Sequence, residues 1–256
     1  MSRIALDGKT AVIIGGTSGI GRTMSIGLAA AGANVVATGR RAELIESVAK
    51  EIEAQGVKTL RQPADVGDRV SLQALHDAVA SSIGPVDILI NCAGRTIKSP
   101  TLDVTEDDWQ AVLETNLHGT LRACQVFGRP MIARGYGRII NIASLSSFVA
   151  LYHVAGYAAS KAAVASLTKS LAVEWAQHGV TVNAIAPGVF RTDLNSALLD
   201  GTERGKEFLL RTPMRRFGRL EELIGAAVFL ASDAASFVNG EVLVVDGGFL
   251  ASGVNQ

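Results

Sequence analysis

A tyrosine and a lysine four residues apart form the pair in this chain with the clearest chemical potential. Tyr157 and Lys161 stand in the run Tyr-Ala-Ala-Ser-Lys, so a helix over this segment would place them on one face. An ammonium group beside a phenol favours the phenolate and lowers the phenol pKa. With Ser144 and Asn116 earlier in the chain, the pair predicts proton exchange with an alcohol or a ketone near neutral pH. A tyrosine ring packed under the stem of a surface lysine is the alternative.

Length, charge and cysteine content narrow the class of protein. The 256 residues are 48% hydrophobic, which is enough for one large domain or two small ones. Lys plus Arg and Asp plus Glu each total 24, so no basic excess indicates nucleic-acid binding, and a net charge of zero permits self-association. Cys92 and Cys124 lie in apolar contexts without metal-ligand spacing, as buried reduced thiols do. Without a membrane-span pattern or a signal peptide, we expect a soluble cytoplasmic protein.

Short apolar runs alternate with longer helical patterns along the chain. The expected strands are residues 10–14, 34–38, 58–62, 88–91, 137–142, 180–185 and 242–245. The expected helices are residues 20–31, 42–55, 69–82, 106–133, 154–177 and 221–230. Most strands are apolar throughout, which is typical of parallel strands covered on both faces. The sequence therefore predicts an α/β fold with a seven-stranded parallel sheet and helices on both faces.

Several residues mark the expected helix ends. Gly32, Gly56 and Gly179 fall just past helices, where a left-handed backbone is favoured. Thr105 stands three residues before Asp108 and predicts an N-cap followed by an acidic first turn.

A glycine-rich turn joins the first expected strand to the first expected helix. Glycines permit a tight turn and close approach of the backbone to a phosphate, and the helix N-terminus offers free N–H groups. An ordinary strand–helix turn is the alternative, but its place in an α/β pattern favours a nucleotide. The expected contact residues are Gly15, Thr17, Ser18, Gly19, Ile20 and Gly21.

The end of the second expected strand predicts which dinucleotide binds. Gly39 stands where an acidic residue would hydrogen-bond the adenosine ribose of NAD, and Arg40 follows it. A guanidinium group there suits a 2′-phosphate, so we expect NADP, with NAD still possible. Arg40 as part of a solvated helix start is the alternative. Asp65 and Val66 are expected at the adenine edge, although Asp65 could equally be a simple turn residue.

Taken together, these residues resemble the short-chain dehydrogenase/reductase family from about residue 6 to residue 248. The resemblance implies a Rossmann-type, doubly wound fold in one cofactor-binding and catalytic domain over residues 1–256. The motifs that carry it are Gly15, Gly19, Gly21, Asn91-Cys92-Ala93-Gly94, Asn116, Ser144, Tyr157, Lys161, Pro187-Gly188, Thr192 and Val245-Asp246-Gly247-Gly248. Ile14 and Cys92 depart from the family pattern, which normally has a threonine and an asparagine there. These departures could alter how the nucleotide loop and the strand at 88–91 are held.

The resemblance also implies a role for each catalytic residue. Tyr157 would exchange a proton with the substrate oxygen, and Ser144 would hold that oxygen in place. Lys161 would lower the pKa of Tyr157 and bind the nicotinamide ribose, while Asn116 would hold a water behind the lysine. No metal is required. Further cofactor contacts are implied for Asn91, Ala93, Gly94, Tyr157, Lys161, Pro187, Gly188, Val189 and Thr192.

Residues 188–219 interrupt the strand–helix alternation, and we expect them to form a substrate lid. His153 is expected near the mouth of the site. A local basic surplus in the lid favours an anionic substrate, such as a sugar acid or a carrier-bound acyl group, although a solvated helical lid is the alternative. The lid's basic residues are Arg191, Arg204, Lys206, Arg211, Arg215, Arg216 and Arg219. Its acidic residues are Asp193, Asp200, Glu203 and Glu207.

The sequence leaves three hypotheses for the substrate and function open. Residues 211–218, 222–227 and 237–240 look like the gluconate 5-dehydrogenase branch of the family, with the 3-oxoacyl carrier-protein reductases as runner-up. A non-catalytic NADP-binding regulatory protein on the same fold is a third hypothesis. The resemblance further implies a homotetramer, in which the long helices at 106–133 and 154–177 and the C-terminal strand with its Phe249-Leu250 tail contact other subunits.

Overall fold

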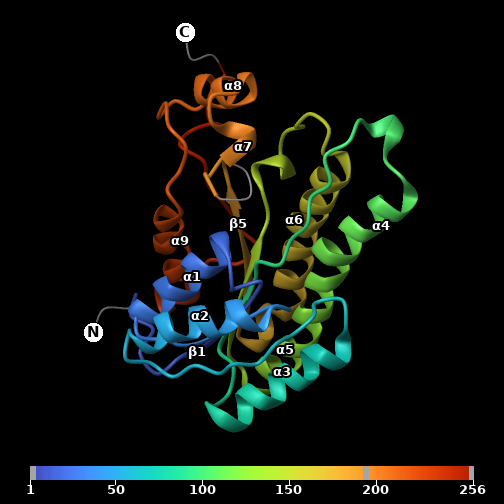
Figure 1. Ribbon diagram of the computed structural model, residues 1–256. Coiled ribbons are helices and arrows are strands. Elements are labelled where there is room, and N and C mark those ends of the chain that lie inside the picture. The colour runs from blue at the N-terminus through green and yellow to red at the C-terminus, as the bar shows by residue number, and fades with distance from the viewer. Residues whose placement is uncertain (1–3, 193–195, 254–256) are drawn as a thin grey trace.

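A parallel β-sheet with helices on both faces forms the frame of the protein (Figure 1). The computed structural model describes residues 4–192 and 196–253. Within these residues the strand order is β2-β1-β3-β4-β5-β6, and every neighbouring pair is parallel. The order reverses between β1 and β3, and ligands of such sheets bind in the crevice at the carboxyl ends of the strands. The strands are β1 (Thr10–Ile14), β2 (Asn34–Thr38), β3 (Ile88–Asn91), β4 (Gly137–Ile142), β5 (Val180–Pro187) and β6 (Val242–Val245).

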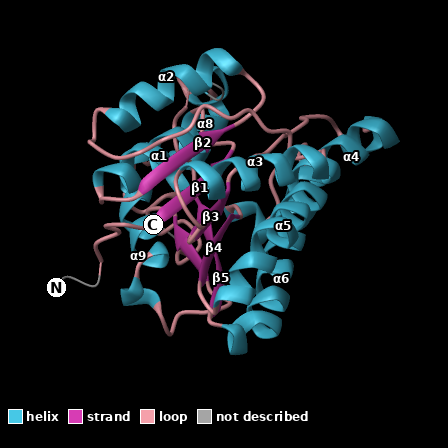
Figure 2. Ribbon diagram, turned by 90° about the horizontal axis from the view of Figure 1, so that it is seen from below, coloured by secondary structure: helices cyan, strands magenta, loops and turns pink. Residues whose placement is uncertain are grey.

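The helices form a layer on each side of the sheet. Seen from below in Figure 2, α1, α2 and α9 lie on one side, and α3, α5 and α6 lie on the other. The α-helices are α1 (Gly19–Ala30), α2 (Ala42–Glu53), α3 (Arg69–Ser82), α4 (Glu106–Leu113), α5 (Gly119–Arg134), α6 (Ala155–Trp175), α7 (Ser196–Leu199), α8 (Glu203–Arg211) and α9 (Ile224–Ala231). The short helical turns are η1 (Thr101–Asp103), η2 (Glu114–His118), η3 (Leu145–Ser147), η4 (Ala176–His178), η5 (Leu220–Leu223) and η6 (Asp233–Ala235).

Burial of both faces of the central strands explains why they read as continuous apolar runs. Every residue of β1, β3, β4 and β5 is buried. One apolar cluster joins the sheet to α1, α2 and α9, and a second joins it to α3, α5 and α6. Each cluster removes apolar surface from water, which is the main favourable term in folding. The predicted parallel α/β fold is therefore confirmed.

One expected strand is not part of the sheet. Residues 58–62 run beside β2 but share few backbone hydrogen bonds with it. Val35 donates its backbone N–H to the carbonyl of Lys58 at 3.0 Å, whereas Lys58 N–H and Gln62 C=O pair with the side chains of Asn34 and Thr38. Because side chains replace most of the ladder, the described sheet has six strands rather than the predicted seven.

The long helix expected at 106–133 is interrupted at its centre. Its middle, η2, is a π-helical turn that contains Asn116 and separates α4 from α5. The side chain of Thr120 donates to the backbone carbonyl of Asn116 at 2.7 Å, which satisfies a carbonyl at this bulge. Such bulges insert one residue and are frequent at functional sites. The bulge turns Asn116 toward the loop that follows β3.

The predicted helix ends agree with the structure. Gly32, Gly56 and Gly179 have φ angles of 96°, 80° and 72°, in the left-handed region. The hydroxyl of Thr105 accepts the backbone N–H of Asp108 at 3.1 Å and caps α4. The helix expected at 221–230 differs slightly, because it starts as the 3₁₀ turn η5 before it continues as α9.

The segment expected to form a lid contains two helices of its own, α7 and α8, which lie beyond the end of the sheet in Figure 1. A bridge between Phe190 and Gly218 joins the two ends of this segment. The acidic residue Asp193 lies outside the described residues. Within residues 4–192 and 196–253, no helix combines the length and apolar character needed to cross a membrane.

Candidate active site

Ser144 and Tyr157 meet just beyond the carboxyl end of β4. Ser144 precedes the turn η3, where its hydroxyl accepts the backbone N–H of Ser146 at 3.1 Å. Tyr157 lies in the first turn of α6, and its phenol is hydrogen-bonded to the Ser144 hydroxyl. The structure thus brings together the two hydroxyl groups that the sequence singles out, and it pairs Tyr157 with Ser144 rather than with Ser146 or Ser147.

Lys161 lies one turn further along α6 with its ammonium group inside the protein. Only 4% of its surface is exposed, and Nζ donates to the carbonyl oxygen of Ile142 at 2.6 Å. The same Nζ is 5.7 Å from the centre of the Tyr157 ring. Burial disfavours the charged form and lowers the pKa of Lys161 to about 8.

The pKa of Tyr157 differs from the sequence-based expectation. Burial raises it above the ordinary value for tyrosine, and the hydrogen bond with Ser144 offsets part of that rise. The expectation that Lys161 lowers this pKa is therefore not met in the structure. The reason is geometric: the ammonium group bonds to the carbonyl of Ile142 at the end of β4. Tyr157 accordingly carries its proton at neutral pH.

Asn116 holds the loop that follows β3. Its side chain is fully buried; Oδ1 accepts the backbone N–H of Arg95 at 2.7 Å, and Nδ2 donates to the Arg95 carbonyl at 2.9 Å. Nδ2 also donates to the hydroxyl of Ser160 at 2.9 Å. Asn116 therefore fixes this loop against α6.

Ser160 is a site residue that the sequence reasoning missed. Its side chain is fully buried, accepts from Asn116 and donates to the backbone carbonyl of Tyr157 at 2.7 Å. Through these two bonds it ties the π-helical turn η2 to the first turn of α6. A serine between a tyrosine and a lysine inside an expected helix was the available signal, because serine is unfavourable there unless it hydrogen-bonds.

The glycine-rich turn approaches the neighbouring loop closely. Gly15 has a φ of 77°, and a Cβ atom there would lie 2.5 Å from the backbone nitrogen of Ala93. Gly19 has a φ of 49°, and its nearest contact is the Thr192 methyl group, 4.0 Å from an added Cβ. Only glycine fits the first position, and the second leaves space for a ligand beside Thr192.

The start of α1 leaves backbone donors for that ligand. The N-cap residue Ser18 makes no side-chain capping bond, and the first helical bond runs from Arg22 N–H to the Ser18 carbonyl. The amides of Gly19, Ile20 and Gly21 precede that bond, so their N–H groups have no intrahelical partner and form the positive end of the helix dipole. These residues fit a pyrophosphate group.

The expected ribose position combines Gly39, Thr17 and Arg40. A Cβ atom on Gly39 would lie 3.1 Å from the hydroxyl of Thr17, so a larger residue here would crowd Thr17. Arg40 follows as an exposed side chain, with no hydrogen bond or ion pair to the described residues. A polar cradle next to an unengaged guanidinium group fits the 2′-phosphate of NADP.

Asp65 and Val66, which are expected at the adenine edge, make local contacts. The Asp65 carboxylate accepts the backbone N–H of Gly67 at 2.9 Å and forms a turn, as the alternative interpretation holds. Val66 packs against Gly119, where an added Cβ would lie 2.5 Å from its side chain. Both residues therefore have structural contacts of their own, and their role at the adenine stays a prediction.

The remaining expected cofactor contacts follow the carboxyl ends of β3 and β5. Lys161 Nζ lies 3.9 Å from the position of a Cβ on Gly94, so this loop passes directly over the lysine. Asn91 has a structural role as well, since Nδ2 donates to Oδ1 of Asn141 at 2.9 Å. Pro187 ends β5, and the Gly188 N–H bonds to Val245 at 2.8 Å. Val189 then accepts the backbone N–H of Gly218 at 3.0 Å.

The two departures from the family pattern leave the backbone intact. Cys92 donates its backbone N–H to the carbonyl of Ile14 at 2.9 Å, which joins β3 to β1 where the strands end. Gly15 N–H continues the link to β2 by bonding to the carbonyl of Thr38 at 2.9 Å. Burial raises the pKa of the Cys92 thiol to about 11, so it is protonated at neutral pH.

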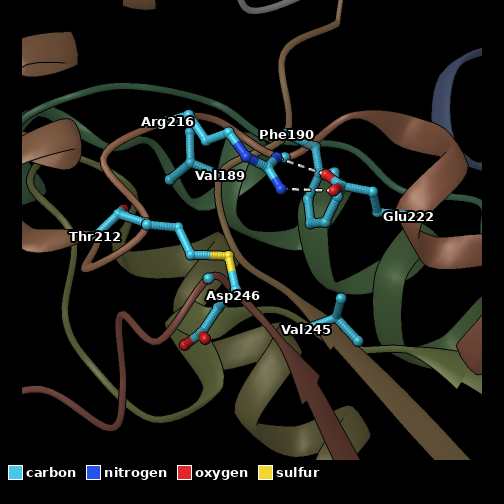
Figure 3. Close-up of a pocket in the computed structure, with 10 residues that line it drawn as sticks. Val189, Phe190, Thr212, Arg216, Glu222, Val245 and Asp246 are labelled. Carbon is cyan, nitrogen blue, oxygen red and sulfur yellow. Dashed lines mark hydrogen bonds and ion pairs between the residues drawn. The ribbon is translucent and has the colours of Figure 1, made fainter.

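A cavity of about 170 Å³ lies at the base of the lid, between the ends of β5 and β6 (Figure 3). In the close-up, Arg216 points toward Glu222 across this cavity, with hydrogen bonds of 2.7 and 2.6 Å. Hydrogen bonds from Arg216 lower the pKa of Glu222 to about 2. The ion pair therefore joins the lid to η5 at any pH near neutrality.

Other lid charges pair in the same way. Carboxylates of the lid and of η5 bind five of the seven basic residues that the sequence counts as a surplus. These pairs are Arg191 with Asp200, Lys206 with Glu203, Arg211 with Glu207, and both Arg216 and Arg219 with Glu222. The overall surplus is therefore a weak guide to the substrate, and the individual geometry of each cation matters more.

Comparison with known proteins agrees with this geometry. The family model described as "Enoyl-(Acyl carrier protein) reductase" matches residues 15–250. A gluconate 5-dehydrogenase of Gluconobacter oxydans (strain 621H) is 42% identical over 248 residues, 97% of each chain. A D-threitol dehydrogenase of Mycolicibacterium smegmatis is 41% identical over 95% of this chain and 94% of its own.

Solved structures give the same result. The crystal structure of a gluconate 5-dehydrogenase from Burkholderia cenocepacia J2315, in complex with NADP and tartrate, is similar with a TM-score of 0.94. The two chains are 41% identical, and the similarity covers 98% of each. The matched part of the chain carries the glycine-rich turn, Ser144, Tyr157 and Lys161 on a parallel sheet. The chain belongs to the short-chain dehydrogenase/reductase family.

Proposed function

We propose that this protein is an NADP(H)-dependent oxidoreductase that interconverts a secondary alcohol and a ketone, with a sugar acid as substrate. The observation that carries the proposal is the hydrogen-bonded pair of hydroxyls, Ser144 and Tyr157, beside the buried ammonium group of Lys161. Gly94 lies beside Lys161, in the loop after β3 that the glycine-rich turn contacts at Ala93. A proton-transfer residue next to a nicotinamide position is suited to carbonyl reduction.

Because Tyr157 carries a proton, the protein in this protonation state is suited to the reduction of a ketone. Its raised pKa keeps the phenol protonated, so it can donate a proton to a ketone oxygen. Ser144 hydrogen-bonds the phenol and would hold the same substrate oxygen. When bound, NADPH supplies the hydride, and NADP accepts it in the reverse reaction. For oxidation, Tyr157 must first lose its proton, so alkaline pH should favour the alcohol as substrate.

The cofactor would be held by the residues that line the crevice. The amides at the start of α1 fit the pyrophosphate, while Thr17 and Arg40 fit a 2′-phosphate. The neighbouring loops would hold the rest of the cofactor through Asp65, Val66, Asn91, Ala93, Gly94, Tyr157, Lys161, Pro187, Gly188, Val189 and Thr192. Substituting Arg40→Asp should lower the ratio of NADP to NAD efficiency by at least tenfold. Arg41→Asp is the matched control, because it makes the same charge change one residue further on, at the N-cap of α2; equal ratios in both variants would contradict the role of Arg40.

Sugar acids are the preferred substrate class because of the relatives. One is a gluconate 5-dehydrogenase, and a solved relative of the same activity holds tartrate, a small hydroxy acid, together with NADP. The direct experiment measures NADP reduction with gluconate and NADPH oxidation with 5-ketogluconate. Turnover of acetoacetyl thioesters in preference to both acids would favour the acyl carrier-protein reductase alternative. NADPH binding without turnover of any ketone would favour a non-catalytic protein.

The assembly and location follow from the same reasoning. We treat residues 1–256 as one domain with a lid at 188–219, which acts in the cytoplasm as a homotetramer. The exposed apolar side chains of Val173 on α6 and Phe237 near β6 support subunit contacts along these elements. Light scattering of the purified protein should give four times the mass of the chain, and a monomeric mass would contradict the assembly.

A further inference from the structure

One basic residue of the lid differs from the others in its surroundings. Arg204, at the start of α8, is half-buried, whereas the other six basic residues between 188 and 219 are exposed. Five of those six are paired with lid or η5 carboxylates. Among the described residues, no carboxylate lies within ion-pair distance of Arg204. The neighbouring acids Glu203 and Glu207 bind Lys206 and Arg211 instead.

The guanidinium group of Arg204 is held in place by uncharged partners. Its Cζ atom lies 5.5 Å from the centre of the Phe208 ring, one turn further along α8. Phe208 in turn packs against Phe249 from the C-terminal segment, with ring centres 6.2 Å apart. One Arg204 nitrogen, Nη1, is 3.5 Å from the backbone carbonyl of Tyr152, which is a weak contact. The group is positioned, but most of its five donors remain available.

Arg204 contacts the loop that connects two of the proposed catalytic residues. Tyr152 and His153 lie on the segment that connects Ser144 to Tyr157. His153 has a left-handed φ of 63°, unusual for a residue with a side chain, and its ring packs on Tyr152 with centres 4.8 Å apart. The carbonyl of His153 accepts the backbone N–H of Ser99, from the loop after β3, at 2.9 Å. Lid, catalytic loop and β3 loop therefore meet at this point.

We propose that Arg204 binds the carboxylate of the substrate and thereby selects sugar acids over neutral polyols. The inference rests on the proposed function and names the group that recognises the acid. A guanidinium group matches a carboxylate with two parallel hydrogen bonds, and a half-buried position strengthens the attraction. The lid holds this group beside the loop that connects Ser144 to Tyr157, so the acid end of the substrate would bind the lid while the reacting carbon stays at Tyr157.

The test compares two substrates that differ only at one end. Gluconate and glucitol share their carbon chain, but gluconate has a carboxylate where glucitol has a hydroxymethyl group. With NADP, Arg204→Gln should raise the KM for gluconate about 10- to 100-fold with little change in kcat. Its activity on glucitol should stay within twofold of wild type. Arg204→Lys keeps a point charge and should recover part of the gluconate affinity.

Lys206→Gln is the matched control, because it removes one positive charge from the same helix at an exposed, paired position. This variant should keep the wild-type KM for gluconate, and thermal melting should show that both variants fold. Equal KM values in Arg204→Gln and Lys206→Gln would overturn the inference. So would equal losses on gluconate and glucitol, which would indicate a purely structural role. A wild-type enzyme that oxidises glucitol but not gluconate would overturn the proposed substrate class itself.

Discussion

Burial controls the protonation of both titratable residues at the centre of the site. It lowers the pKa of Lys161 to about 8 and raises that of Tyr157, so each shift favours the neutral form. From the sequence alone, the pKa of Tyr157 is predicted only from the attraction between the ammonium group and the phenolate. In the structure the ammonium group bonds to Ile142, and desolvation is the larger effect on both residues. The pair is therefore set for proton donation rather than for a permanent phenolate.

The lysine should leave a signature in stability as well as in catalysis. Unfolded Lys161 titrates near the ordinary lysine value of 10.5, but the folded form titrates near 8. Between these values the unfolded chain binds more protons, so stability rises with pH through this window. We expect wild type to gain about 2 kcal/mol relative to Lys161→Met between pH 8 and pH 9.5.

Urea unfolding of both proteins across this range measures the difference. The two cysteines titrate in both proteins, so their contribution largely cancels in the comparison. A difference in unfolding free energy that stays constant from pH 8 to pH 9.5 would contradict the lowered lysine pKa.

The side chain of Ser160 should contribute more to the stability of the protein than its small size suggests. Replacing it with alanine leaves one Asn116 N–H buried without an acceptor, which costs about 1–3 kcal/mol. Ser170→Ala is the control, since Ser170 is exposed on the same helix and should change stability by less than about 0.5 kcal/mol. Chemical denaturation gives both values. If the two variants were equally stable, the bridge between η2 and α6 would not be significant.

At the scale of elements, the sequence predicts those parts of the fold that depend on local pattern. The five confirmed strand bounds are 10–14, 34–38, 88–91, 137–142 and 242–245. Most of these residues are apolar; β1, β3 and β4 are buried throughout, whereas the edge strand β6 is half-buried. Residues 58–62 contain a single apolar residue, Leu60, and none of them is buried, so they lack this pattern, and side chains replace their ladder.

Two further features depend on tertiary contacts, so no local pattern reveals them. The π-helical turn adds one residue, which hardly disturbs the apolar spacing, and its cause is the contact of Asn116 with the β3 loop. The same holds for Arg204, whose partner Tyr152 is 52 residues away. The candidate catalytic residues could be predicted from motif spacing. The hydrogen bonds that position them could not be predicted in this way.

The base of the lid is packed so closely that one added methyl group should disturb it. A Cβ atom on Gly218 would lie 2.3 Å from the ring of Phe190, which is itself buried. Gly218→Ala should therefore displace the ring and destabilise the protein by about 1–3 kcal/mol, with a higher KM because the lid base shifts.

Gly225→Ala provides the contrast. Gly225 lies in α9 with no atom within 4 Å of an added Cβ, so alanine should be neutral or stabilise by up to about 1 kcal/mol. Urea midpoints of the two variants decide the matter, and similar values would show that the lid base tolerates repacking.

At the scale of the whole molecule, the parallel sheet gathers distant segments at one edge. The glycine-rich turn follows β1, the loop held by Asn116 follows β3, Ser144 follows β4, and the lid follows β5. Because all these strands are parallel, their carboxyl ends open into one crevice between the two helical layers. The residues proposed for cofactor binding, proton transfer and substrate selection thus come from different segments, and the sheet fixes their relative positions.

The central claim is that Tyr157 transfers a proton during NADP-dependent oxidoreduction of a sugar acid. The most direct measurement follows NADPH oxidation with 5-ketogluconate in wild type and in Tyr157→Phe, with NADPH affinity measured alongside by fluorescence. Phenylalanine keeps the ring and removes only the hydroxyl, so we expect turnover to fall by about 10²- to 10⁴-fold while NADPH binding changes little. Turnover by Tyr157→Phe at the wild-type rate would contradict the account.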